Sequence, residues 1–230
     1  MKTLLLMIAP LMVGACGSMP DPAPEHAHTF AFLRTGTKRA DFSGPALQEL
    51  MKGHMANIGR LATEGQLYVA GPMGQGNPEP SLRGIFILAT GDTSAAEALC
   101  QSDPSIAAGV LDAEVVPFLT NRDLRAVLDR GLEFEERRKL DPSISMIDGM
   151  TTYALLHVED GERASQALAT LHASRTILLE GHLGGARSGQ RLYFLDVRDL
   201  PSATATLAPL QSSLGPHTLF PWFGSSALRL

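Results

Sequence analysis

The 230-residue sequence has few cysteines, few aromatic residues and few charges, and each shortage narrows the classes of fold and function. Only Cys16 and Cys100 are present, so no disulfide framework is available and apolar packing must hold the fold. Charged residues make up 19% of the chain, the formal net charge is -5, and no basic patch with interleaved aromatic residues occurs. We therefore expect no nucleic-acid partner. The length suffices for one large domain or two small ones.

Familiar catalytic and cofactor motifs are also absent. The sequence has no G-x-S-x-G, H-E-x-x-H or Walker motif. The glycines at 71–76 lead into an expected strand rather than a helix, so this loop fails as a phosphate- or dinucleotide-binding motif. His26 and His28 lack a third ligand nearby, and we expect no metal and no cofactor. His182 and His217 are interpreted as scattered surface histidines, the alternative being a second site.

The first sixteen residues have the layout of an export signal. Lys2 supplies the positive start, an apolar stretch runs to Val13, and small residues precede Cys16. The stretch is too short to span a bilayer comfortably. Residues 13–16 resemble a bacterial lipobox, which implies lipidation of Cys16; in an ordinary cleaved signal this cysteine would be incidental. We expect a lipid-anchored protein of the bacterial envelope, at the outer membrane facing the periplasm, with Cys100 as a buried, inert thiol.

The next part of the chain predicts a tether and a first α+β unit. Residues 17–27 contain three spaced prolines, which are typical of an extended tether of roughly 30 Å at about 3 Å per residue. Residues 28–120 then predict a βαββαβ order, the ferredoxin-like arrangement. Strands are expected at 28–35, 66–70, 84–89 and 111–118, and helices at 45–63 and 93–101. Residues 30–33 and 85–88 leave neither sheet face polar, so a second layer should cover the face that the helices leave open.

The C-terminal half repeats this order after a connector. Residues 121–150 predict a charged helix over 121–140 and a loop. Within 151–225, strands are expected at 152–158, 176–181, 190–197 and 217–223, and helices at 162–172 and 202–210. Two segments align without gaps, 61–71 with 171–181 and 114–118 with 218–222. We interpret the chain as a degenerate duplication of the α+β class, with two βαββαβ units in one molecule.

His54 and Asp103 are the candidate functional residues, although each has a structural alternative. His54 lies on the apolar stripe of its helix, and periodicity alone favours a satisfied core histidine. Asp103 precedes Pro104, and Gly109 follows a short turn, which is the pattern of a helix N-cap and C-terminal glycine. Spacing alone does not establish an active site at either residue.

Together, however, their surroundings resemble a known family. The segments GHMANIGRLATEGQLYVAGPM, LRGIFIL and CQSDPSIAAGVLDAEVVPF closely resemble the YCII-related (YciI-like) family over about residues 28–120. The resemblance implies the dimeric α+β barrel version of the ferredoxin-like fold, with His54 and Asp103 together in a pocket. Few members have an assigned reaction; one is a dechlorinase acting on a hydroxylated aromatic ring, and muconolactone isomerase shares the broader fold. Gly71 and Pro72 are expected in the pocket wall, unless their segment is a plain hairpin loop.

The second unit departs from the family pattern at the critical positions. Ala164 stands where the first unit has His54, and His182 stands where it has Pro72. We therefore expect one site per molecule, with the second unit as a built-in partner.

A catalytic dyad would restrict the chemistry. A carboxylate beside imidazole fixes its tautomer and suits general acid–base catalysis near neutral pH. Suitable reactions are isomerisation, elimination or dehalogenation of a small cyclic or aromatic molecule. Two alternatives stay open: a periplasmic module that binds a small molecule without turnover, and an envelope interaction protein in which both residues are structural.

Overall fold

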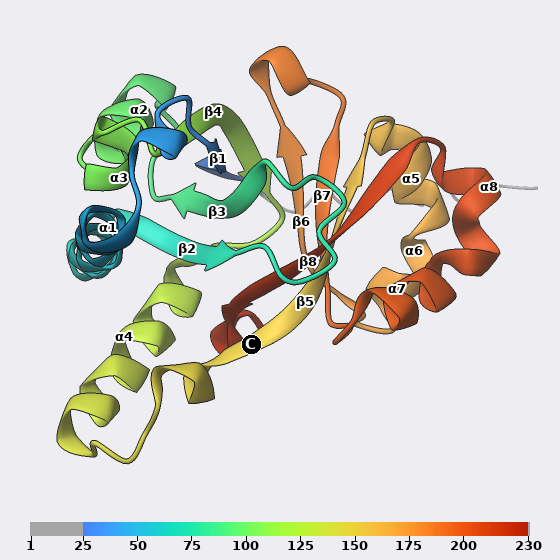
Figure 1. Ribbon diagram of the computed structural model, residues 1–230. Helices are drawn as coiled ribbons and strands as arrows, with labels where there is room; N and C mark the ends of the chain where they lie inside the picture. Colours follow the sequence, from blue (N-terminus) through green and yellow to red (C-terminus); the bar gives the residue numbers. More distant parts are fainter. Residues whose placement is uncertain (1–24, 230) are drawn as a thin grey trace, which may run out of the picture.

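The computed structural model describes residues 25–229, and Figure 1 shows two α+β units joined through their strands. The expected export signal, the expected lipidation site Cys16 and most of the expected tether lie outside the described residues. Within the described residues, no helix has the length and apolar character needed to cross a membrane.

The first unit follows the predicted order of strands and helices. Its elements are β1 (His26–Thr35), α1 (Gly44–Thr63), β2 (Leu67–Pro72), β3 (Leu82–Leu88), α2 (Thr93–Gln101), α3 (Pro104–Ala107) and β4 (Leu111–Thr120). Pro45 in the first turn of α1 and Gly65 just beyond its end, with a φ of 74°, explain the limits of that helix. β1 begins two residues before its predicted start, because its pairing with β4 extends to His26 opposite Thr120.

The second unit repeats these elements with shorter helices. They are β5 (Met150–Val158), α5 (Gly161–Ala167), α6 (Ala169–Ala173), β6 (Ile177–Leu183), β7 (Arg191–Leu195), α7 (Leu200–Leu207), α8 (Gln211–Leu214) and β8 (His217–Ser225). The helix predicted over 162–172 is broken at the fully buried Leu168. The helix predicted over 202–210 instead begins at Leu200, and a 3-10 turn joins it to α8.

The connector forms α4 (Arg125–Leu140), which projects away from the sheet in Figure 1. The predicted start at Asn121 is wrong by four residues. The backbone N–H of Asn121 donates to the carbonyl oxygen of Glu180 at 3.3 Å, and its side-chain oxygen accepts from the N–H of Glu180 at 3.4 Å. These contacts hold the chain against β6, so the helix can begin only after it has turned away. A 3-10 turn over Met146–Gly149 precedes β5, and another over Ser226–Arg229 follows β8.

The eight strands form an antiparallel, nearly closed barrel. Their order is β2-β3-β1-β4-β6-β7-β5-β8, so each unit supplies four adjacent strands. β4 pairs with β6 at one junction between the units. At the other, Met73 bridges to Trp222 and the N–H of Gly74 donates to the carbonyl oxygen of Pro221 at 2.7 Å. The chain therefore has the dimeric α+β barrel fold that the sequence predicts, formed by two units of one molecule.

The register of the strands shows that the two units are built alike. β2 has an irregularity near its start against β3, and β6 has one at the same place against β7. Counting from these irregularities, Gly71 corresponds to Gly181 and Pro72 to His182, as in the ungapped sequence alignment.

A glycine from each unit makes room for an aromatic side chain of the other. A Cβ on Gly71 would overlap the backbone of β8 and lie 2.8 Å from Nε1 of Trp222. A Cβ on Gly181 would overlap the ring of Phe118. Trp222 and Phe118 occupy equivalent places in β8 and β4, since each follows the strand's proline. The two junctions are therefore related by the same glycine–aromatic contact.

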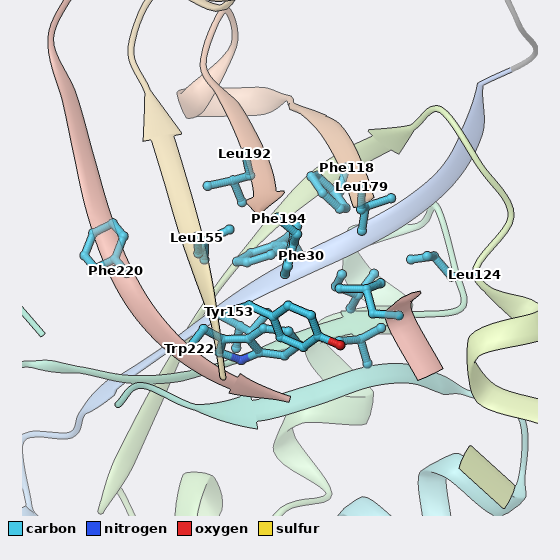
Figure 2. Close-up of a cluster of buried hydrophobic side chains, with 14 of the residues drawn as sticks. Phe30, Phe118, Leu124, Tyr153, Leu155, Leu179, Leu192, Phe194, Phe220 and Trp222 are labelled. Atoms are coloured by element: carbon cyan, nitrogen blue, oxygen red, sulfur yellow. The ribbon is translucent and has the colours of Figure 1, made fainter. Parts of the chain in front are cut away.

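The barrel interior is one of three apolar cores. Figure 2 shows Phe30 and Phe118 of the first unit near Tyr153, Phe194 and Trp222 of the second. The rings of Phe30 and Phe118 lie 5.2 Å apart, and those of Tyr153 and Trp222 lie 5.5 Å apart. The two other cores lie between each half of the sheet and its own helices. The strands are thus apolar on both faces because one face meets helices and the other meets the second unit.

Candidate functional site

The structure brings His54 of α1 and Asp103 of the turn before α3 into direct contact. His54 Nδ1 lies 2.7 Å from Asp103 Oδ2. Asp103 is fully buried and His54 is 8% exposed. The two residues are 49 positions apart in the chain, so only the packing of α1 against α3 makes this pair.

Asp103 forms the predicted helix cap and also contacts His54. Its Oδ1 accepts a hydrogen bond from the N–H of Ser105 at 2.9 Å and caps α3, while its Oδ2 contacts His54. Gly109 ends the segment with a φ of 74°, as the pattern predicted. The capping contact fixes the carboxylate, so that its second oxygen is held toward the imidazole ring.

The contact also sets the tautomer of His54. An ionised carboxylate only accepts hydrogen bonds, so Nδ1 must be the donor. The neutral ring then carries its lone pair on Nε2, and no described residue forms a hydrogen bond with that nitrogen. The ring lies nearly parallel to Phe86 of β3, with centroids 6.0 Å apart and an interplanar angle of 17°. The Asp103 carboxylate and the Phe86 ring thus hold the imidazole of His54 in one orientation.

Ser105 and Gly53 hold the Asp103 turn against α1. The Ser105 hydroxyl donates to the carbonyl oxygen of Leu50 at 3.1 Å. A Cβ on Gly53 would lie 3.0 Å from Cγ of Pro104, so the missing side chain lets α3 approach α1 beside His54. Sequence reasoning missed both residues; the glycine inside a helix, next to the candidate histidine, was the available signal.

A second polar link lies on the other side of the dyad. The Arg60 guanidinium donates to the side-chain oxygen of Asn57 at 2.8 Å and to the hydroxyl oxygen of Ser102 at 2.9 Å. Asn57 is buried and stands three residues after His54, on the same helix face. In the sequence, the signal for this contact was the amide side chain of Asn57 on the otherwise apolar face of its helix. The two links fix the dyad geometry from both sides.

A cavity of about 1560 Å³ adjoins His54. We call it the His54 cavity. It lies against α1 and the first-unit strands, and its lining continues to α4 and the end of β8. Gly71 and Pro72 both line it, together with Phe86 and Met51. The glycine at 71 is nevertheless required by the approach of β8 rather than by the cavity.

Cys100 is close to the dyad but is not a nucleophile. It is fully buried, and burial, together with the nearby charge of Asp103, raises the pKa of its thiol to about 12. The reactive thiolate is therefore negligible at neutral pH. No group of three or more histidine, cysteine or carboxylate side chains that could hold a metal occurs within residues 25–229.

The second unit has larger, charged side chains at two positions where small residues line the His54 cavity. By strand register, Ala70, Gly84 and Phe86 correspond to Glu180, Arg191 and Tyr193. Glu180 binds Arg191 at 2.7 Å and His172 at 2.9 Å. Burial alone would raise the pKa of Glu180, but His172 and Arg191 together hold it below its usual range. A paired carboxylate and guanidinium, Glu180 and Arg191, thus stand where the first unit has Ala70 and Gly84.

The two histidines considered as a second site have separate surroundings. His182 lies 3.6 Å from Glu180, at the edge of this ion-pair cluster. His217 donates from Nδ1 to the carbonyl oxygen of Gly215 at 2.8 Å. Ala164, which stands at the His54 position in the sequence comparison, is buried in the outer core of the second unit.

Comparison with known proteins agrees with this division of the chain. Residues 30–119 match the YCII-related domain family. The match runs from β1 to β4 and includes both His54 and Asp103, whereas the second unit lies beyond it. No curated protein matches the chain.

Two solved structures are similar to the chain. A variant of chlorite dismutase from Candidatus Nitrospira defluvii is 14% identical with a TM-score of 0.54, and the match covers 87% of this chain and 91% of that one. A candidate monooxygenase from Lactobacillus acidophilus NCFM is 12% identical with a TM-score of 0.46, covering 87% of this chain and 94% of that one. The likeness to the chlorite dismutase is one of fold alone, and it supports the barrel of eight strands.

Proposed function

We propose that the YCII-related domain is an acid–base enzyme in which His54 and Asp103 act on a small cyclic or aromatic molecule. One observation carries the proposal: a buried carboxylate holds Nδ1 of His54 at 2.7 Å and leaves Nε2 as the free ring nitrogen at a cavity. An oriented imidazole next to a mostly apolar pocket is the arrangement expected of a general base for a small ligand.

The chemistry follows from the orientation of the ring. Nε2 of neutral His54 accepts a proton from a carbon or hydroxyl group of the ligand, and Asp103 stabilises the imidazolium that forms. The proton is then returned to a different atom in an isomerisation, or lost with a leaving group in an elimination or dehalogenation. Apolar neighbours such as Phe86 keep the step away from bulk water.

Replacing His54 with asparagine tests this role. We expect proton transfer to fall about 10²- to 10⁴-fold, the usual contribution of a general base. The assay screens small aromatic and lactone acids by thermal shift and follows solvent deuterium exchange into the compounds that bind. His172→Asn, which alters a histidine of the second unit, is the matched control. Unchanged exchange in the His54 variant would refute the dyad, and tight binding without exchange in the wild type would identify a binding module.

We also propose that the chain is lipid-anchored through Cys16 in the bacterial envelope. The lipobox-like residues 13–16 and the proline-bearing segment that separates Cys16 from β1 support this. In a bacterium with two membranes, the full chain should incorporate labelled fatty acid and sediment with membranes. Cys16→Ser should abolish labelling, and Cys100→Ser should not. Labelling that persists in the Cys16 variant would refute the anchor.

A further inference from the structure

The charged residues around the His54 cavity are almost all arginines. The chain has a net charge of -5, yet one acidic residue, Glu135, lines the cavity against six arginines. The arginines are Arg39, Arg83, Arg130, Arg137, Arg138 and Arg229. A cleft lined by one sign of charge, with apolar walls, concentrates ligands of the opposite sign. The charge distribution therefore favours an anionic ligand.

Of the six arginines, Arg138 pairs with Glu135 and Arg229 with Asp196, and the other four have no carboxylate partner among the described residues. Other arginines of the two units are paired, for example Arg187 with Glu114 at 2.6 Å. Of the two that the first unit contributes, Arg39 donates to the backbone carbonyl of Phe42 at 3.0 Å, and Arg83 has no ion pair with any described residue. An Arg guanidinium that no carboxylate neutralises is suited to a carboxylate or phosphate group.

Arg39 and Arg83 line the cavity from the first unit, whereas the other four arginines lie in α4 or in the turn after β8. Arg39 is in the turn just after β1, and Arg83 is in β3 beside the last residues of β1. Arg83 stands three residues before Phe86, the ring under His54, a distance of roughly 10 Å along a strand. An acid group held by these arginines would place the adjacent atoms of a ligand near Nε2.

The cavity is longer than a single ring requires. Its α1 lining runs from Leu47 to Ala62, roughly 22 Å along a helix axis. The residues that line it beyond His54 are mainly apolar and include Met55 and Ile58 of α1 and Leu132 of α4. Its volume of about 1560 Å³ also exceeds the usual range for small-ligand pockets, about 300 to 1000 Å³.

Two helical glycines keep this long part of the cavity open. Gly59 of α1 and Gly131 of α4 both line the cavity, and a Cβ on either would meet nothing within 4 Å. Glycine inside a helix costs roughly 0.5 to 1 kcal/mol relative to alanine. No close contact explains either residue, unlike Gly53 or Gly71, so the space they leave is the feature that they supply.

We propose that the His54 cavity binds an elongated amphiphilic anion, with its acid group held by Arg39 and Arg83 and its apolar tail along α1 toward α4. This inference rests on the proposed function, since it names the substrate class of the same site. The tail explains the length and apolar walls of the cavity, and the acid explains the two unpaired arginines that the first unit contributes.

Calorimetric titration of the purified protein with dodecanoate, hexanoate and dodecanol, below their aggregation concentrations, tests the proposal. Dodecanoate should bind at least tenfold more tightly than either of the other probes. Arg39→Gln and Arg83→Gln should each weaken dodecanoate at least tenfold. Arg198→Gln, an exposed arginine of the second unit outside the cavity, should change nothing.

Gly131→Leu tests the tail separately from the acid. The new side chain enters empty space, so the protein should keep or raise its melting temperature. Dodecanoate should bind at least tenfold more weakly to this variant, while hexanoate affinity stays within twofold. Equal affinity for dodecanol and dodecanoate, no dodecanoate binding, or equal weakening of both acids by Gly131→Leu would overturn the proposal.

The outcomes separate this inference from the proposed catalytic role. His54→Asn should retain dodecanoate binding within about threefold. If the charge and length preferences hold but no bound ligand exchanges protons, the acid–base function fails and the ligand class stands. If proton exchange depends on His54 but binding shows neither preference, the ligand class fails and the function stands.

Discussion

Replacing Gly71 with alanine is expected to destabilise the protein by about 3 kcal/mol, the upper part of the range for an overpacked core. The added Cβ would overlap the backbone oxygen of Phe223 and lie 2.8 Å from Nε1 of Trp222. A flexible side chain could move aside, but the nearest atom belongs to the backbone of β8. Relief therefore requires β2 and β8 to separate at the junction that closes the barrel.

Thermal and urea unfolding measure this effect. About 3 kcal/mol corresponds to a melting temperature lower by roughly 6 to 12 °C for a chain of this size. Gly59→Ala is the matched control, because its Cβ enters open space in a helix and should stabilise the protein by roughly 0.5 to 1 kcal/mol. A Gly71 variant as stable as the wild type would show that the two units do not pack together as described.

Much of the fold can be predicted from local sequence patterns. Strand alternation, helix periodicity and turn glycines such as Gly65 act over a few residues, so they give the order of elements. The duplication follows from two short ungapped segments. The apolar residues on both faces of β1 and β3 predict a second layer, and the other unit supplies it in the barrel interior.

The site is less predictable because its contacts join distant parts of the chain. Nothing local to Asp103 shows that its second oxygen faces His54, and a capping pattern looks the same without that contact. The cavity is equally difficult to predict from the sequence. It is lined by small residues such as Gly84 where the second unit has Arg191, and this difference has meaning only once the strand register is known. The predicted start of α4 was wrong because it also depends on a distant contact: the pairing of Asn121 with Glu180 delays the helix.

Asp103→Ala is expected to cost about 3 kcal/mol, more than the loss of a helix cap. Removing the cap of a helix costs about 1 kcal/mol. Removing the contact with His54 adds about 1.5 to 3 kcal/mol, since a buried Nδ1–H loses a charged acceptor and gains no water. The substitution therefore removes two interactions that meet in one carboxylate.

Asp92→Ala separates the two parts of that cost. Asp92 caps α2 in the same unit, accepting from the N–H of Ser94 at 2.9 Å, and it contacts no histidine. Its substitution should cost about 1 kcal/mol. Combining each change with His54→Ala should give a coupling energy of about 1 to 2 kcal/mol for Asp103 and none for Asp92, measured by urea unfolding. If Asp103→Ala costs no more than Asp92→Ala, the carboxylate is only a cap, and His54 lacks the partner that would make it a base.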